Sequence, residues 1–180
     1  MAHISLPEGV PGISGPMRQY PETARHMNAL AETLLRGPSS LSPAEREMIA
    51  TYVSSQNDCY FCTNCHAATA RHLLEDDRAI MEEVLHEPQS ANIGDKMKTL
   101  LVIAGKVQQG GRRVSDEDVA LARSYGADDQ AIHDTVLIAA AFCMFNRYVD
   151  GLATWAPHDS DVYDQIGERL AQNGYVRSVS

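Results

Sequence analysis

Apolar side chains recur at intervals of three and four residues along much of the chain, which is the spacing of one face of an α-helix. Residues 43–56 show this clearly, with Met48 and Val53 among the apolar positions. This segment also carries helix-start signals, because Ser42 is a favourable N-cap, a proline follows it, and Glu45 completes a capping box. The pattern therefore predicts a helix over about 43–56.

Similar segments, bounded by glycine and proline, follow one another through the sequence. Residues 1–19 differ, because proline and glycine recur there and predict an irregular N-terminal segment. Runs that alternate with period two are scarce, which argues against a sheet. We therefore expect an all-α helical bundle that forms a single domain over residues 20–180. The predicted helices cover residues 21–36, about 43–56, about 58–74, 77–87, 95–109, 115–126, 128–155 and roughly 160–172.

The helix expected over residues 128–155 differs from the others, because its run from Val136 to Phe145 is apolar almost all round. A helix without a polar face is typical either of the centre of a core or of a contact between subunits. The sequence supports both arrangements equally. Cys143 lies alone in this run, and we interpret it as a core residue.

The charge of the chain restricts its partners. Lys and Arg number 15 against 24 Asp and Glu, which gives a formal net charge of -9. Such acidity opposes binding to nucleic-acid phosphates and to anionic lipid. The most apolar run, residues 135–145, is shorter than the roughly 20 residues of a membrane span, and no secretory signal is visible. We expect a soluble, cytoplasmic protein with no nucleic-acid and no membrane partner.

Candidate chemistry is concentrated in "NDCYFCTNCHAATARH", residues 57–72, which holds three of the four cysteines. On a helix turning about 100° per residue, Cys59, Cys62 and His66 share one narrow face, and Cys65 lies beside it. The thiolate is the nucleophile of cysteine chemistry, and a histidine or a helix N-terminus lowers the thiol pKa. A second thiol nearby condenses with the sulfenic acid that an oxidant forms on the first. The pattern is typical of a redox-active dithiol.

The same residues are also compatible with a buried, a metal-binding or a structural role. Buried cysteines often act as small apolar side chains. Zinc would use the same atoms, although structural zinc usually takes ligands from two separated pairs and no second Cys/His pair is present. A structural disulfide is disfavoured, because its closed loop is very short and cytoplasmic thiols stay reduced. His72 is interpreted as a surface residue.

The stretch "EREMIATYVSSQNDCYFCTNCH" resembles the signature of the AhpD-like alkylhydroperoxidases, within the carboxymuconolactone decarboxylase superfamily. The signature is a glutamate followed, after about a dozen residues, by C-x-x-C-x-x-x-H. Here these positions are Glu47, Cys59, Cys62 and His66. The later "LIAAAFCMFNRYVDGLA" is similar to the family's long helix, and the lead "LPEGVPGISGPM" is similar to its peroxidase-related branch.

The resemblance implies an all-helical homo-oligomer, commonly a trimer or hexamer, that reduces a hydroperoxide through its dithiol. It implies that Cys62 attacks the peroxide and that Cys59 resolves the product as a disulfide. His66 and Glu47 would form the proton relay. The expected partners are a hydroperoxide substrate and an unidentified disulfide reductant, and the reaction needs no metal and no cofactor.

This sequence departs from the family pattern at two positions. Cys65 is an additional cysteine, and Phe61 stands where the best-known members carry a histidine. Other functions therefore remain as alternatives. The chain would be a decarboxylase or isomerase of a small lactone or keto acid if His66 and Glu47 served as acid and base. It would be a zinc-binding or redox-sensing module if the cysteines supported no turnover, or a purely structural oligomer if they were unreactive.

Overall fold

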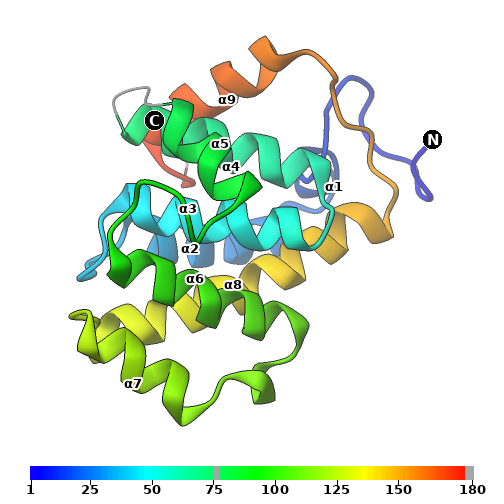
Figure 1. Ribbon diagram of the computed structural model, residues 1–180. Coiled ribbons are helices and arrows are strands. Elements are labelled where there is room, and N and C mark those ends of the chain that lie inside the picture. Colours follow the sequence, from blue (N-terminus) through cyan, green and yellow to red (C-terminus); the bar gives the residue numbers. More distant parts are fainter. Residues whose placement is uncertain (75–77, 177–180) are drawn as a thin grey trace.

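The regular structure is entirely helical in the residues that the computed structural model describes, which are 1–74 and 78–176 (Figure 1). The predicted all-α class is therefore confirmed. No helix within these residues is both long enough and apolar enough to cross a membrane. The helices are α1 (Ser14–Gln19), α2 (Pro21–Arg36), α3 (Pro43–Gln56), α4 (Tyr60–Leu73), α5 (Arg78–His86), α6 (Asp95–Gln109), α7 (Asp116–Ser124), α8 (Asp129–Gly151) and α9 (Ser160–Asn173), with a 3-10 turn over Gly111–Arg113.

The capping signals in the sequence begin helices where they are expected. At the start of α3, the Glu45 backbone N–H donates to the Ser42 hydroxyl at 3.2 Å, and the Ser42 N–H donates to the Glu45 carboxylate at 2.7 Å. Ser115 and Asp118 form the same reciprocal pair at the start of α7. Each box satisfies backbone donors that a helix start otherwise leaves free. Helix starts are thus determined locally.

The N-terminal segment departs from the prediction, because residues 1–19 are not wholly irregular and contain α1. Pro16 lies in the first turn of α1, where a helix does not need the missing backbone N–H. Pro16 and Gly15 are buried, and Leu6 packs close to Gly15. Proline and glycine here allow a short, tightly packed helix instead of preventing one.

One helix end also differs clearly from the prediction. The long helix α8 ends at Gly151, short of the expected Trp155, because Ala153 has a left-handed φ of 50° that turns the chain away from the helix axis. The helix predicted over 77–87 is α5, and the start of that prediction lies outside the described residues.

The centre of the molecule is the pair of helices α3 and α4. A three-residue turn joins them, so they run antiparallel, and α4 packs against α9 on its other side. Helix α8 crosses behind and packs against both α3 and α6 (Figure 1). Their shared core includes fully buried side chains from four helices, such as Leu35, Ile49, Leu101 and Phe142.

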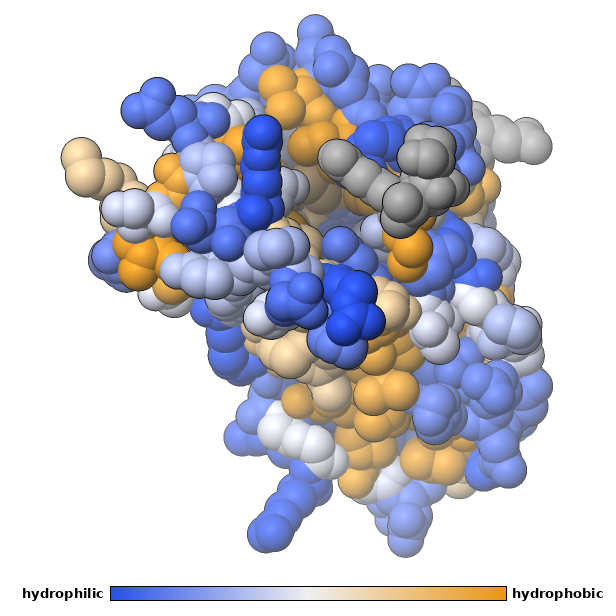
Figure 2. Space-filling model, turned by 180° about the vertical axis from the view of Figure 1, so that it is seen from behind, coloured by the Kyte–Doolittle hydropathy of each residue, from blue (hydrophilic) through white to orange (hydrophobic). Residues whose placement is uncertain are grey.

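Helix α8 is a core helix on one face only. Ile138, Phe142 and Val149 are almost completely buried, whereas the opposite face leaves Leu137 38% and Met144 46% exposed. Figure 2 shows apolar residues gathering on the side of the molecule turned away from the view in Figure 1. The long apolar run therefore supplies the core and also leaves an apolar surface on the single chain.

Helices α4 and α9 approach closely at Gly167. A Cβ atom built there would lie 2.6 Å from Ala68 Cβ and 2.8 Å from the Thr69 backbone nitrogen, which is closer than real contacts allow. Glycine is therefore required for α9 to lie against the helix that carries the cysteines.

We expect Gly167→Ala to lower the free energy of unfolding by about 1–3 kcal/mol, which is the usual cost of forcing extra atoms into a packed contact. Chemical denaturation measures the change. Gly151→Ala is the matched control, because nothing lies within 4 Å of a Cβ at that position. Equal stability of the two variants would contradict the close helix contact.

Candidate active site

A sharp turn before α4 presents the first cysteine. Asp58 has a left-handed φ of 56°, and Cys59 becomes the N-cap of α4 instead of a residue within it. The buried Asn146 side chain ties this turn to two helices, because it accepts a hydrogen bond from Asn57 at 2.9 Å and donates one to Ser54 at 3.1 Å. The asparagine of α8 thus fixes the backbone from which Cys59 projects.

Cys59 and Cys62 are free thiols that face one another. The Cys59 thiol donates a hydrogen bond to Cys62, and the backbone N–H of Cys62 donates to the Cys59 sulfur. The pKa of Cys59 is raised, mainly by its hydrogen bond to Cys62 and then by burial. Cys59 therefore keeps its proton. Sequence spacing placed these two sulfurs on one face, and the structure brings them into contact.

The dithiol lies beneath a cover of apolar side chains. Cys59 is 0% and Cys62 3% exposed, in a cluster with Phe61, Val149 and Tyr163. The N-terminal segment passes over this cluster, and hydrogen bonds from the His3 N–H to Leu152 O and from the Gly12 N–H to Trp155 O, each 2.9 Å long, tie it to the loop after α8. Gly12 lies directly against the Phe61 ring.

A polar hollow of about 530 Å³ reaches the edge of this cover. Asn57, Asp58 and Asp150 are among the residues that line it. The Asp150 carboxylate interacts with the Cys59 side chain, and burial raises the Asp150 pKa. The hollow therefore leads from the surface to a carboxylate in contact with the dithiol.

The third cysteine of the motif is an isolated thiol. Cys65 is 3% exposed, and burial raises its pKa, an effect that the positive charge of Arg169 opposes only in part. A buried thiol that keeps its proton is a poor nucleophile. Cys65 therefore has a different environment from the Cys59–Cys62 pair.

Glu47 lies beside His66, as the family signature implies. The His66 Nδ1 atom is 2.7 Å from Glu47 Oε2, and Glu47 is completely buried. The other oxygen, Oε1, accepts hydrogen bonds from Arg36 Nη2 at 2.7 Å and from the Tyr175 hydroxyl at 2.5 Å. Burial alone would favour the neutral acid, but His66, Arg36 and Tyr175 together hold the Glu47 pKa below its ordinary value. The carboxylate is thus ionised in a dry environment.

Arg36 and Tyr175 are site residues that the sequence did not reveal. A buried glutamate must be paired, so the need for a cation could be inferred once Glu47 was known to be buried. Which residues supply these contacts could not be inferred, because they lie far from the motif in the chain. Tyr175, for example, is 109 residues from His66. Both side chains are brought to Glu47 by packing alone.

Other predicted residues lie outside this site. His72 is partly buried, with Nε2 3.2 Å from Asp164 of α9, so the interpretation of it as a surface residue was wrong. Cys143 is partly buried and packs against the main core. Within residues 1–74 and 78–176, no three Cys, His, Asp or Glu side chains are grouped to hold a metal ion.

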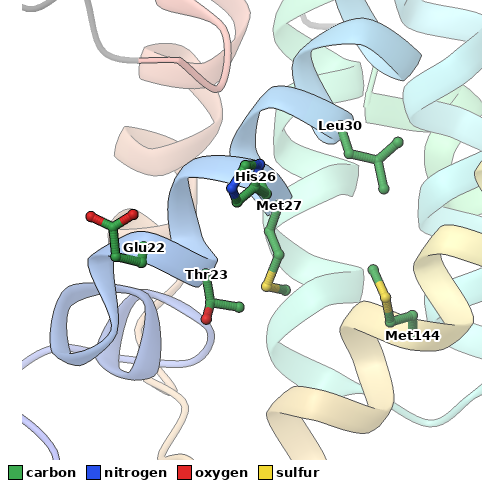
Figure 3. A pocket seen from close by; sticks show the side chains of 6 residues that line it. All are labelled: Glu22, Thr23, His26, Met27, Leu30 and Met144. Carbon is green, nitrogen blue, oxygen red and sulfur yellow. The ribbon is translucent and has the colours of Figure 1, made fainter.

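A second hollow, of about 460 Å³, lies between α2 and α8 (Figure 3). Thr23, Met27, Leu30 and Met144 line it, together with Glu22 and His26. None of the predicted catalytic residues contributes to it. It belongs to the apolar surface that α8 leaves exposed.

Residues 21–87 match the model of the carboxymuconolactone decarboxylase family, and this range contains Glu47, both cysteines of the dithiol and His66. A peroxidase-related protein from Silicibacter sp. TM1040 has a similar structure, with a TM-score of 0.75 and 28% identity over 83% of this chain and 78% of that one. The predicted resemblance to the AhpD-like proteins of the carboxymuconolactone decarboxylase family is therefore confirmed.

Other comparisons support the AhpD-like fold. The AhpD core structure of an uncharacterized peroxidase-related protein from Ralstonia eutropha JMP134 gives a TM-score of 0.77 and 25% identity, over 88% of this chain and 81% of that one. A protein of unknown function from Agrobacterium tumefaciens shares the fold, with a TM-score of 0.67 and 19% identity over 80% of this chain and 97% of that one. No curated protein matches the sequence.

The AhpD-like site yields a test of the buried Glu47 carboxylate. Glu47→Gln leaves the Arg36 charge without its counter-ion, and we expect it to lower the free energy of unfolding by about 3 kcal/mol near neutral pH. Because the Glu47 pKa is lowered on folding, the carboxylate stabilises the protein above its ordinary pKa of 4.5 and loses this effect as the pH falls through the folded value. The stability difference should therefore shrink below pH 4.5.

Urea denaturation at several pH values measures this difference. Glu22→Gln is the control, because the Glu22 side chain is 90% exposed and the same chemical change there should have little effect. A difference that does not vary with pH would contradict an ionised Glu47.

Proposed function

We propose that this chain is a thiol-dependent hydroperoxide reductase, with Cys62 as the attacking thiolate and Cys59 as the resolving thiol. The observation that carries the proposal is the hydrogen-bonded Cys59–Cys62 pair on the same helix as His66, which Glu47 holds at 2.7 Å. Two proteins of similar structure are described as peroxidase-related, which supports the same reaction class.

The reaction follows from ordinary thiol chemistry. The Cys62 thiolate attacks one peroxide oxygen, so an S–O bond forms, the O–O bond breaks, and the alkoxide leaves and takes up a proton. Cys62 is then a sulfenic acid. Cys59 attacks that sulfur, the S–S bond forms, and water leaves. An external dithiol, of a kind that the reducing cytoplasm supplies, returns the disulfide to two thiols.

His66 acts as the base and acid in this scheme, and Glu47 orients it. The partners of His66 place a proton on Nδ1, where it is donated to Glu47, so Nε2 is the nitrogen that accepts the proton of Cys62. His66 and Cys62 are one helical turn apart on α4, which puts their side chains on the same face. The lowered pKa of Glu47 means that it stays charged, so it stabilises the imidazolium instead of carrying the proton onward.

In this proposal, the substrate approaches the dithiol through the hollow beside Asp150. The sulfurs are almost fully buried, and this hollow ends at a carboxylate that contacts Cys59. The reductant would act on the same side, because Cys59 is the sulfur that Asp150 contacts. Asp150 is therefore also placed to take the proton that Cys59 loses when the disulfide forms.

A decarboxylase is the second candidate, because the family model that matches residues 21–87 takes its name from that reaction. His66 and Glu47 would then act as acid and base on a small lactone or keto acid. That chemistry needs no pair of thiols. The two functions therefore predict opposite effects of removing the sulfur of Cys62.

We expect Cys62→Ser to abolish the consumption of cumene hydroperoxide by the reduced protein, because the nucleophile is lost. Cys59→Ser should consume about one equivalent and stop at a sulfenic acid, since no thiol remains to resolve it. Peroxide loss and thiol titration by mass spectrometry measure both outcomes.

Cys65→Ser is the matched control, because it makes the same change on the same helix at a thiol outside the pair. It should retain the wild-type rate. Wild-type protein that consumes no peroxide, or a Cys62→Ser variant that remains active, would reject the reductase.

We also propose that copies of this chain assemble into a homo-oligomer. A second copy of the chain is the occupant that fits the apolar surface of α8, since Val136, Leu137 and Met144 are exposed apolar residues there and the chain carries a net charge of -9 that would oppose association elsewhere. The expected assembly is a homotrimer or homohexamer.

Sedimentation equilibrium should show three or six chains, and Leu137→Glu should reduce the assembly because it places a charge in the buried contact. Leu121→Glu is the control, since Leu121 is an exposed leucine on α7 that is not part of this surface. Wild-type protein that sediments as a monomer would contradict the assembly.

A further inference from the structure

Tyr175 reaches the Glu47–His66 pair from the segment that follows α9. Its hydroxyl lies 2.5 Å from Glu47 Oε1 and 3.2 Å from His66 Nδ1. Its ring is nearly parallel to the His66 ring, with centroids 6.1 Å apart, and the Arg36 guanidinium lies 5.2 Å from the centre of the Tyr175 ring. One side chain therefore contacts the acid, the base and the cation of the site.

The backbone around Tyr175 is anchored to α2. The backbone N–H groups of Tyr175 and Val176 both donate to Glu32 Oε2, at 2.6 and 3.3 Å. Gly174 makes the turn between α9 and this anchor, with a left-handed φ of 66° and no room for a Cβ against Glu32. The position of the Tyr175 hydroxyl is thus fixed by several contacts.

The direction of each hydrogen bond follows from charge. Burial and then the negative charge of Glu47 raise the Tyr175 pKa well above its ordinary value, so the hydroxyl keeps its hydrogen and donates it to Glu47. Its oxygen is then free to accept from His66 Nδ1, whose hydrogen also points toward Glu47 Oε2. Both contacts favour the same tautomer, with Nε2 unprotonated.

We propose that Tyr175 is a positioning residue of this site, whose hydroxyl keeps Glu47 ionised and holds the proton of His66 on Nδ1. The consequence for peroxide reduction rests on the proposed function, but the effect on His66 does not. The other charged or titratable groups that act on Glu47 are Arg36 from α2 and Arg46 from α3, and Cys65 of α4 acts on Tyr175. All of them remain when the hydroxyl is removed.

Tyr175→Phe tests the proposal, because it keeps the stacked ring and removes only the hydroxyl. The Glu47 charge then loses one donor, so Glu47 and His66 together take up a proton at higher pH. We expect the apparent pKa of the pair, followed through the His66 imidazole by NMR, to rise by about one unit, the size expected for one hydrogen bond to a charged group. The acidic limb of any peroxide-dependent rate should move by the same amount.

Tyr163→Phe is the matched control. The Tyr163 hydroxyl is also buried, but it donates to the Pro157 carbonyl at 2.8 Å, so removing it should leave the His66 titration unchanged. An upward shift in Tyr175→Phe alone supports the proposal. A titration identical to that of the wild type, or a shift of equal size in both variants, overturns it.

Two further measurements keep the proposal separate from the proposed function and from folding. Wild-type protein that consumes no hydroperoxide would reject the reductase, while the His66 titration would still test Tyr175. If Tyr175→Phe does not fold, Glu32→Ala frees the anchored backbone without touching the ring or hydroxyl, and it should also raise the apparent pKa of the pair. A folded Glu32→Ala protein with an unchanged titration then overturns the proposal.

Discussion

The arrangement of the site depends on one buried charge, the carboxylate of Glu47. A charged group without water must be matched by donors, or it takes up a proton or destabilises the fold. Glu47 receives hydrogen bonds from α2 through Arg36, from α4 through His66 and from the segment after α9 through Tyr175. Three parts of the chain that are distant in sequence are therefore held at fixed positions by one carboxylate. The same contacts that hold the helices together also orient the imidazole.

The dithiol depends on a second, smaller set of polar contacts. Asn146 of α8 is completely buried and satisfies the turn before α4 through Asn57 and Ser54. Because buried polar groups must find partners, this turn cannot relax without leaving an amide unpaired. The turn makes Cys59 the N-cap of α4, with its sulfur against Cys62. Asn146 of α8 therefore has a structural role that its sequence motif alone does not explain: it holds the turn that positions Cys59.

Burial gives the two sulfurs different properties. The Cys59 thiol is held between Cys62 and Asp150 and keeps its proton, whereas Cys62 receives hydrogen bonding from Cys59 and lies one turn from a base. In the proposed reductase, this asymmetry separates the attacking thiol from the resolving thiol without any difference in side-chain chemistry. The cover formed by the N-terminal segment limits access to both sulfurs. In the proposed reductase, the polar hollow at Asp150 is the side from which reactants approach.

The sequence by itself determined the helices, the family resemblance and four residues that carry the proposed chemistry. Helix periodicity, the Ser42–Glu45 box and the spacing of Cys59, Cys62 and His66 are local properties, so they can be read from neighbouring residues. Only the tertiary structure decided that Arg36 and Tyr175 complete the site, that α8 ends at Gly151, and that the thiols are covered. These features depend on contacts between residues far apart in the chain and on backbone conformations, such as that of Ala153, which sequence spacing does not encode.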